Sequence, residues 1–321
     1  MNIWILTKHS DTEYENARLI QEFSDLNVAT MLVHPNKFNT ILKHTGKNTI
    51  KYDNKVIDFP DGILIRTGSG TDYHSLTVLR EFESKHVKVI NSSTSTIVAK
   101  DKLLSGQILS CHGISIPKTM LVRFPVVNVH EYTKEISKEI GFPCVLKVNT
   151  GSFGHGVHLC RTEEEFFSLI QLIQTIAPNS QILLQEFIAT KIGHDLRVWV
   201  VGGKVLGAMQ RKGADGDFRA NISNGGTGTS YPLNDDIIEI AGQAAAFLGL
   251  DIAGVDLLFN GDSFTVCEVN SSPGFLGFEK YCDQNVAKVI AEHVINSIKP
   301  INAAQLAEHV VVPEDVPPQA T

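Results

Sequence analysis

The sequence lacks the features that mark membrane and secreted proteins. No apolar run approaches the length that a transmembrane helix requires. The first residues have neither the charged start nor the long apolar stretch of a signal peptide. The five cysteines, at positions 111, 144, 160, 267 and 282, show no metal-ligand or redox spacing. We therefore expect a cytoplasmic protein whose thiols are reduced and mostly buried.

Several catalytic and binding signatures are also missing. The serines and histidines form no nucleophile elbow, which argues against a catalytic triad. His155 and His158 have no thiolate or carboxylate at ligand spacing, so we expect no zinc site. The loop at 150–156 lacks the terminal Gly-Lys-Ser/Thr of a Walker loop. Tyr73 stands where a dinucleotide fingerprint that begins at Gly68 would need its third glycine.

Positive charge is scarce. The chain has 28 Lys and Arg against 35 Asp and Glu, and its net charge of −7 argues against nucleic acid as the main partner. An anionic small ligand remains compatible, because it needs only a local basic cluster. With 43% hydrophobic and 20% charged residues, the composition is typical of a soluble globular protein. The 321 residues suffice for one large domain or two to three small ones.

Strands alternate with helices in the first third of the chain. We expect strands at 3–7, 28–33, 63–65 and 87–90, and helices at 13–25 and 75–84. This alternation predicts an α/β layer with parallel strands. Arg66 directly follows one of these strands, and ligands of open α/β sheets lie beyond the carboxyl ends of strands. Arg66 is therefore either a substrate contact or a solvated loop residue.

The remainder of the chain mixes hairpins with helices, which predicts α+β architecture there. We expect helices at 94–110, 130–140, 162–176, 236–248 and 284–298, strands at 144–148, 157–159, 181–188, 196–201 and 204–209, and a polar loop at 211–231. Prolines 313, 317 and 318 argue against packed structure near the end. The predicted units are an N-terminal α/β domain (1–97), a central subdomain (98–187), a C-terminal subdomain (188–303) and a mobile tail (304–321).

A hairpin at 254–274 carries Asp256, Glu268 and Asn270 on otherwise apolar strands. Glu268 and Asn270 share a face, because strand side chains alternate with a period of two. A two-residue turn at Asn260 and Gly261 would point Asp256 away from them, whereas a three-residue loop or an equivalent bulge would bring it to the same face. We predict the loop or bulge, because a polar face of three oxygen ligands suits a hard cation. A solvated edge hairpin is the alternative.

Basic residues flank the glycine-rich loop at 150–156. The loop joins two strands, so its backbone amides can fold over phosphates, and Lys147 lies just before it. Asp195 and Arg197 are two residues apart on a strand, which allows either a plain ion pair or two ligand contacts. The 211–231 loop holds Arg211, Lys212 and Arg219, which form either a solvated loop or a guanidinium site for carboxylate or phosphate.

Taken together, these segments closely resemble the ATP-grasp enzymes, and within them the RimK family of glutamate-adding carboxylate–amine ligases. The resemblance runs from Met1 to about Lys299. The matching motifs are AKDK at 99–102, PCVLK at 143–147, LQEFI at 184–188, GHDLR at 193–197, GDFRAN at 216–221, AGVD at 253–256 and EVNSSPG at 268–274. It implies an ATP-grasp fold preceded by an open-sheet domain.

The resemblance also implies roles for particular residues. ATP would be bound by the loop residues Gly151, Ser152, Gly154 and Gly156 together with Lys102, Lys147, Glu186, Phe187, Ile188, Asp195, Arg219, Ala220 and Asn221. Magnesium, or manganese, would be held by Asp256, Glu268 and Asn270. Arg211 and Arg219 would be the catalytic arginines, and Arg211 and Asn270 would join Arg66 as substrate contacts.

The family mechanism transfers the γ-phosphate of ATP to a carboxylate, and an amine then attacks the acylphosphate to form an amide. The partners implied are glutamate and a protein or small-molecule carboxylate acceptor, in a dimer or tetramer. Phe153 and His155 depart from the family pattern in the glycine-rich loop. Two alternatives remain: a related ligase that makes macrocycles in a precursor peptide, and a nucleotide-binding module without catalysis.

Overall fold

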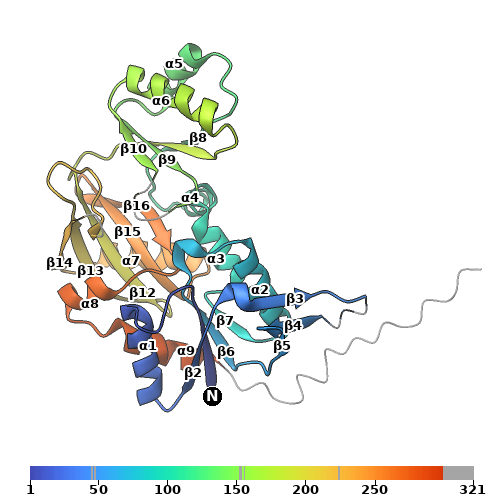
Figure 1. Ribbon diagram of the computed structural model, residues 1–321. Helices are drawn as coiled ribbons and strands as arrows, with labels where there is room; N and C mark the ends of the chain where they lie inside the picture. The colour runs from blue at the N-terminus through green and yellow to red at the C-terminus, as the bar shows by residue number, and fades with distance from the viewer. Residues whose placement is uncertain (45, 47, 152–153, 155, 223–224, 299–321) are drawn as a thin grey trace, which may run out of the picture.

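The computed structural model describes residues 1–44, 46, 48–151, 154, 156–222 and 225–298. The tail predicted at 304–321 lies outside these residues, as do Ser152, Phe153 and His155. Figure 1 shows three regions stacked on one another, with the N-terminal sheet at the bottom, the C-terminal sheet in the middle and a small central subdomain at the top. No helix in the described part of the chain has the length and apolar character needed to cross a bilayer.

The N-terminal region is the parallel open sheet that the sequence predicts, in the order β2-β1-β6-β7. Its elements are β1 (Asn2–Leu6), α1 (Tyr14–Asp25), β2 (Ala29–Val33), β6 (Gly62–Ile65), α2 (Tyr73–Ser84) and β7 (Lys88–Ile90). Helix α2 begins where the Asp72 side chain accepts a hydrogen bond from the amide of Ser75. The connection after β1 leads to β2 on one side of it, and the later connection after β2 crosses to β6 on its other side, which opens a crevice beyond the carboxyl ends of β1 and β6.

A second, antiparallel sheet projects from this region and was not predicted. It consists of β3 (Phe38–Ile41), β4 (Thr49–Tyr52) and β5 (Lys55–Val56), preceded by the short helix η1 (Pro35–Lys37). Phe38 and Ile50 point into the core beneath the parallel sheet. Its short strands carry many polar residues, which is why the apolar pattern did not reveal them.

The prediction of one helix at 94–110 is wrong in one respect, because the segment forms two helices. They are α3 (Ser93–Lys100) and α4 (Lys102–Cys111). Asp101 between them is extended, and its carboxylate accepts a hydrogen bond from the amide of Leu104 at 2.9 Å. Such a side-chain cap starts a new helix. Asp101 thereby places Lys102 at the first position of α4.

The central subdomain is an antiparallel sheet in the order β10-β9-β11-β8, covered by two helices. Its elements are β8 (Thr119–Leu121), α5 (Val129–Glu139), β9 (Cys144–Val148), β10 (Val157–Cys160), α6 (Glu163–Ile176) and β11 (Ile182–Glu186). The glycine-rich loop joins β9 to β10, as predicted. Thr162 caps α6 through the amide of Glu165, but the Glu165 carboxylate accepts from the amide of Arg161 rather than from that of Thr162.

The C-terminal sheet has five strands in the order β14-β13-β12-β15-β16. Its elements are β12 (His194–Val201), β13 (Lys204–Lys212), β14 (Thr227–Tyr231), α7 (Asp235–Phe247), β15 (Ile252–Asn260), β16 (Ser263–Asn270), α8 (Leu276–Cys282) and α9 (Val286–Ser297). Strand β14 and helix α8 were missed, and Arg211 belongs to β13 rather than to the predicted polar loop. Strand β14 reads Thr-Gly-Thr-Ser-Tyr, a sequence without an apolar pattern.

The hairpin of β15 and β16 has the predicted face, which it reaches through a bulge rather than through a three-residue loop. Asn260 pairs with Ser263, so the turn is two residues long, at Gly261 and Asp262. The register then shifts beyond Leu257, which pairs with Val266 while Asp256 pairs with Glu268. This bulge accommodates one extra residue, Cys267, on β16. Of the two predicted arrangements, the structure has the bulge and not the three-residue loop, and Asp256, Glu268 and Asn270 share one face as expected.

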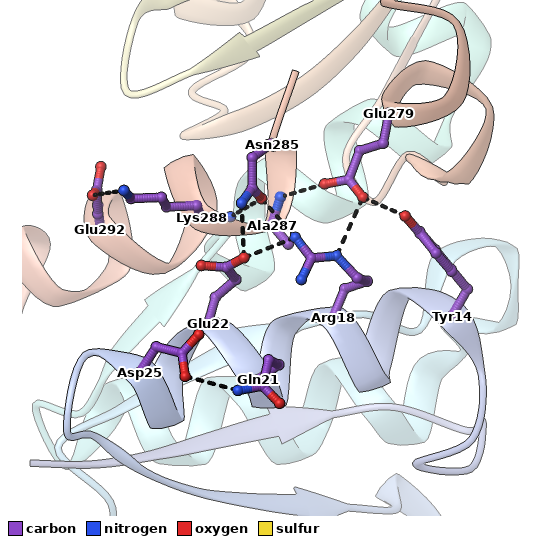
Figure 2. A network of polar contacts seen from close by, with 10 residues as sticks. All are labelled: Tyr14, Arg18, Gln21, Glu22, Asp25, Glu279, Asn285, Ala287, Lys288 and Glu292. Carbon is purple, nitrogen blue, oxygen red and sulfur yellow. Dashed lines mark hydrogen bonds and ion pairs between the residues drawn. The ribbon is translucent and has the colours of Figure 1, made fainter. Parts of the chain in front are cut away.

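A polar network fastens the N-terminal region to the C-terminal helices (Figure 2). Glu279 of α8 accepts hydrogen bonds from the Tyr14 hydroxyl at 2.6 Å and the Ala287 amide at 3.0 Å, and its carboxylate lies 3.5 Å from Arg18 Nε. The hydrogen bond to Glu279 raises the pKa of the Tyr14 phenol. Arg18 also donates to Glu22 at 2.7 Å. Three elements, α1, α8 and the start of α9, thus meet at one carboxylate.

We predict that Glu279→Ala lowers the free energy of unfolding by about 1–3 kcal/mol. The substitution leaves the Tyr14 hydroxyl of α1 and the Ala287 amide of α9 without their acceptor. Chemical denaturation followed by circular dichroism measures the change. Glu292→Ala is the matched control, since the Glu292 side chain is 48% exposed and its ion pair with Lys288 of the same helix is long, at 3.9 Å. Such a pair contributes at most about 0.5 kcal/mol. Equal effects of the two substitutions would contradict the assignment of Glu279 as the fastening point.

Candidate functional site

A cleft lies between the central sheet and the C-terminal sheet. Its described walls include Lys102, Val145, Lys147, Gly151, Gly154, Gln185, Glu186, Phe187, Ile188, Asp195, Phe218, Arg219, Ala220, Asn221, Leu258, Cys267, Glu268 and Asn270. Residues from distant parts of the sequence therefore face one space. One end of the cleft is apolar and the other is charged, which suits a ligand with an aromatic base and phosphates.

Most of the residues singled out in the sequence line this cleft. Those that do so are Lys102, Lys147, Gly151, Gly154, Glu186, Phe187, Ile188, Asp195, Arg219, Ala220, Asn221, Glu268 and Asn270. Gly156, Arg66, Arg211 and Asp256 are not among its lining residues, and Ser152 lies outside the described part of the chain. Asp256 and Arg211 lie behind the cleft wall, and Arg66 lies in a separate cavity.

Two lysines bring positive charge to the charged end. Lys102 Nζ donates to the carbonyl oxygen of Gly151 at 2.8 Å and lies 3.5 Å from Glu268 Oε1. Lys147 is buried, and its ammonium donates to Gln185 Oε1 at 2.9 Å. Sequence reasoning missed Gln185, although it lies within the LQEFI motif. Both ammonium groups keep further donors for an anionic ligand.

Asn149 fixes one of these lysines, and it was also missed. Its side-chain oxygen accepts from the amide of Leu103 at 2.9 Å, and its carbonyl oxygen accepts from the amide of Lys102 at 3.3 Å. Asn149 stands at the end of β9 and is almost fully buried. It therefore ties the start of α4 to the strand that carries Lys147. A polar residue adjoining the glycine-rich loop was the only sequence signal for it.

The glycine-rich loop reaches across the cleft to the C-terminal subdomain. Arg219 Nη1 donates to the carbonyl oxygen of Gly154 at 3.0 Å, and Asp217 holds the same guanidinium at 2.9 Å. Gly154 has a φ of +72°, and a Cβ there would lie 3.0 Å from Asn221 Oδ1 and 3.2 Å from Arg219 Cδ. A larger residue is therefore disfavoured by both backbone conformation and space.

At the apolar end, Val145 and Leu258 come from opposite sheets. Phe187 packs edge-on against Phe218, with ring centroids 6.2 Å apart. The Glu186 carboxylate is already used, because it accepts from the amide of Lys118 at 2.7 Å. The predicted contact with a base through the backbone of this segment is thus compatible with its geometry.

Four charged residues form the buried ion-pair cluster at the charged end: Asp195, which also lines the cleft, Arg211, Asp256 and the partly buried Arg197. Asp195 and Arg197 lie on β12, directly opposite Arg211 of β13 and Asp256 of β15. Arg211 holds Asp195 with two hydrogen bonds of 2.6 and 2.7 Å and lies 3.0 Å from Asp256. Arg197 contacts both oxygens of Asp256, at 2.9 Å to Oδ2 and more closely to Oδ1.

This cluster keeps the Asp256 carboxylate charged, whereas burial raises the pKa of the Asp195 carboxyl despite its two hydrogen bonds from Arg211. Burial disfavours the charged form of Asp256, but the charges of Arg197 and Arg211 outweigh it and lower the pKa of the Asp256 carboxyl. Burial likewise opposes the charge of Arg211, and the two carboxylates outweigh it and raise the pKa of the guanidinium. The catalytic and substrate roles predicted for Arg211 stay predictions, and its visible contacts are with Asp195 and Asp256.

Asp256, Glu268 and Asn270 offer the oxygen ligands that a hard cation prefers. Asn270 Nδ2 points to the Gly254 carbonyl oxygen at 3.4 Å and to Asp256 Oδ2 at 3.5 Å, so its own Oδ1 stays available. The Glu268 carboxylate contacts only Lys102 among the described residues. Those residues contain no group of three His, Cys, Asp or Glu placed to hold a metal. The predicted set uses two carboxylates and an amide, the kinds of oxygen ligand that magnesium prefers. Both Asp256 oxygens are held by Arg197 and Arg211, so Glu268 and Asn270 are the predicted ligands that face the cleft.

Cys267, the bulge residue, also lines the cleft. Burial raises the pKa of its thiol to about 11. A thiol with such a pKa is protonated at neutral pH, whereas the thiolate is the nucleophile. Among the described residues, the cleft therefore presents cations and carboxylates to a ligand, and the Cys267 thiol is not a nucleophile at neutral pH.

Two family models match the chain. The RimK-like ATP-grasp domain matches residues 99–294, and the RimK PreATP-grasp domain matches residues 1–96. A probable alpha-L-glutamate ligase of Marinomonas sp. is 32% identical over 295 residues, which cover 92% of this chain and 95% of the relative. One of Aeromonas salmonicida is 38% identical over 245 residues, which cover 76% and 80%.

Solved structures share the fold. A RimK domain ATP-grasp protein of Sphaerobacter thermophilus matches with a TM-score of 0.71 at 19% identity, covering 92% of this chain and all of that one. The ATP-grasp ligase PsnB, solved with a precursor variant, Mg and ADP, has a TM-score of 0.70 at 17% identity and covers 92% and 98%. D-alanine–D-alanine ligase of Bacillus anthracis, solved with ATP, has a TM-score of 0.66 at 18% identity and covers 92% and 96%.

We predict that Arg211→Ala destabilises the protein by about 3–5 kcal/mol, because it removes two hydrogen bonds from the buried Asp195 carboxylate and one of the two guanidinium groups that hold Asp256. Thermal and chemical unfolding of the purified protein measure the loss. Arg219→Ala is the matched control: its guanidinium is 32% exposed and pairs with Asp217 at the cleft surface. It should change stability by less than about 1 kcal/mol. An Arg211→Ala protein as stable as the control would refute the structural role of the buried ion-pair cluster.

Proposed function

This chain belongs to the RimK-like ATP-grasp family, and we propose that it is an ATP- and magnesium-dependent ligase that joins a carboxylate to an amine. The observation that carries this proposal is the charged end of the cleft. There Lys102 and Lys147 face Glu268 and Asn270, and Arg219 lines the same cleft from the loop between β13 and β14. Phosphoryl transfer depends mainly on positioning and on neutralising charge, and this arrangement supplies both.

In the proposed complex, the base of ATP lies at the apolar end, against the backbone of Glu186, Phe187 and Ile188. The phosphates extend toward Lys102 and Lys147 beneath the glycine-rich loop. The wall formed by Arg219, Ala220 and Asn221 lines the same path. The contact between Arg219 and Gly154 supports a loop that closes over the phosphates and excludes water.

Magnesium, or manganese, would be held by Asp256, Glu268 and Asn270 and would neutralise charge on the phosphates. The buried ion-pair cluster keeps the Asp256 carboxylate ionised, and one of its oxygens would have to leave Arg197 or Arg211 to reach the cation. Lys102 holds Glu268 in position. Arg211 is proposed to act on the substrate through the buried ion-pair cluster. Arg219 is proposed to stabilise the charge that develops on the transferred phosphoryl group.

The proposed reaction has two steps. The substrate carboxylate attacks the γ-phosphorus of ATP, which gives an acylphosphate and ADP. The nitrogen of the amine then attacks the acyl carbon, loses a proton and displaces inorganic phosphate to leave an amide. The names of the relatives support glutamate as the amine, with a protein or small-molecule carboxylate as acceptor.

Further proposals concern organisation. We propose a cytoplasmic homo-oligomer, a dimer or tetramer, with units at 1–97, 98–187 and 188–303 and a tail at 304–321.

Macrocycle formation in a precursor peptide remains a second candidate function, because the PsnB structures share the fold. A binding module without catalysis is disfavoured, since both lysines and every predicted metal ligand are present.

We predict that Glu268→Gln removes most ligase activity and leaves the fold intact. The amide is a weaker cation ligand than the carboxylate, and it no longer balances Lys102. ADP release in the presence of glutamate and acceptor measures the loss, and circular dichroism checks the fold. Glu163→Gln, at the exposed start of α6, is the control and should keep normal turnover. Near-normal turnover in Glu268→Gln would contradict the assignment of Glu268 as a metal ligand.

A screen of carboxylates with hydroxylamine should identify the activated acid before the natural amine is known. The expected result is ATP-dependent formation of a hydroxamate together with ADP, because hydroxylamine intercepts the acylphosphate. Omitting each carboxylate in turn provides the blank. ATP binding without ADP formation across the whole panel would favour the non-catalytic module.

A further inference from the structure

A separate cavity of about 420 Å³ lies beyond the carboxyl ends of β1 and β6. Its walls include Lys8, Glu15, Arg66, Thr67, Ser272 and Gly274. The crevice between β1 and β6 is where the parallel sheet reverses its strand order, the usual ligand position in open α/β sheets. The loop after β16 covers it from the C-terminal subdomain. The volume is within the range of small-molecule sites.

Arg66 in this cavity is a buried cation without an anionic partner. It is only 8% exposed, and its Nη2 donates to the carbonyl oxygen of Pro273 at 2.8 Å. Its guanidinium lies over the ring of Phe275 at 5.5 Å. Its Nη1 is buried and has no hydrogen-bond partner among the described residues. Burial lowers the pKa of Arg66 to about 10, so the group is still charged at neutral pH.

The other buried arginine among the described residues, Arg211, is paired. It is 6% exposed and contacts two carboxylates, Asp195 and Asp256. Arg66 forms no ion pair within 4.0 Å among these residues; the charge of Glu15 favours its charged form, but the two side chains form no direct ion pair. Since burying an unpaired charge is costly, a site that keeps one is prepared for an anion from outside the chain. The planar guanidinium suits a carboxylate.

The cavity also carries negative charge on the opposite wall. Glu13 and Glu15 line it from the start of α1, and Glu15 Oε1 makes only a long contact of 3.5 Å with the amide of Leu276. Lys8 lines the other side but is already paired with Asp72 at 2.7 Å. A ligand with a carboxylate at one end and an ammonium at the other matches this distribution of charge. An amino acid is such a ligand.

The wall that carries Glu15 is held rigidly. Helix α1 begins at the cavity, and one turn further along it Arg18 joins the network with Glu279 and Asn285 (Figure 2). Tyr14, adjacent to Glu15, donates to the same Glu279. The distance between the acidic wall and Arg66 is therefore set by packed elements rather than by a loose loop.

The cavity adjoins the charged end of the cleft. Asn270 lines the cleft, while Ser272 and Gly274 of the same segment line the cavity. Two residues of extended chain span at most about 7 Å. A ligand anchored on Arg66 could therefore present a functional group toward the phosphates. The carboxylate that receives phosphate must stay free to reach ATP, so the ligand anchored by its carboxylate is the amine-bearing substrate.

We propose that this cavity binds the amino acid that supplies the amine, with a carboxylate of that amino acid on Arg66 and its ammonium beside Glu15 before reaction. The inference rests on the proposed ligase function and adds the place and the chemistry of amino-acid recognition. Arg66 is a binding residue in this assignment and takes no part in phosphate transfer.

Calorimetric titration of the full chain tests the proposal without turnover. The protein is first saturated with magnesium and an ATP analogue that cannot transfer its γ-phosphate, and L-glutamate, L-glutamine and L-alanine are then titrated. Arg66→Ala should weaken L-glutamate binding by about tenfold or more, the loss of a charge-assisted pair. Arg66→Lys should fall between, because it keeps the charge but loses the planar fork.

Arg80→Ala is the matched control, an exposed arginine of α2 in the same region, and it should bind L-glutamate normally. Unchanged affinity for the ATP analogue in each variant shows that the fold and the cleft are intact. In an active preparation, Arg66→Ala should raise the KM for glutamate and leave the KM for ATP unchanged.

The proposal is overturned if the wild-type protein binds none of the amino acids, or if Arg66→Ala binds L-glutamate normally while its analogue affinity is intact. It is also overturned if Arg66→Ala loses only binding of the acceptor carboxylate found in the hydroxylamine screen. Failure of the proposed ligase function would give a different result from failure of the binding proposal. Amino-acid binding would still depend on Arg66, but no hydroxamate or amide would form.

Discussion

The buried ion-pair cluster is the interaction on which the candidate site depends. Asp195, Arg197, Arg211 and Asp256 join three adjacent strands of the C-terminal sheet at the level where the hairpin presents Glu268 and Asn270. Buried charges are stable only when they are paired, so each of these residues constrains the positions of the others. Gly254 lets the chain after β16 pass close by, because a Cβ there would lie 2.7 Å from Pro273.

The same segment connects the two sites. After Asn270 the chain passes Ser272 and Pro273, whose carbonyl oxygen accepts from Arg66, and then Phe275 enters the core. That core joins strands of the N-terminal sheet to Trp199 and the C-terminal helices. Together with the network around Glu279, this packing fixes the N-terminal sheet relative to the cleft. A two-substrate reaction needs such a fixed distance between its nucleotide and its second substrate.

Local pattern explains which predictions were confirmed and which were wrong. The parallel N-terminal sheet and the β9–β10 loop followed from strand and helix periodicity, and both are present. The common face of Asp256 and Glu268 was confirmed, but it depends on a bulge at Cys267 rather than on a longer turn. The break at Asp101 was missed because a capping aspartate inside a helical pattern looks like an ordinary polar position. Strand β14 was missed because it has no apolar alternation.

The sequence by itself determined the family, the parallel N-terminal sheet, the hairpin of β9 and β10, and many of the residues that line the cleft, because those motifs are short and locally patterned. Only the tertiary structure decided that Arg211 is buried against Asp195 and Asp256, that Gln185 and Asn149 hold the lysines, and that Arg66 lacks an anionic partner. Pairing of charges and burial depend on which distant segments meet, and no local pattern encodes that. The polar face of the hairpin could be predicted from the sequence, whereas the arginines that pair with Asp256 are brought there only by folding.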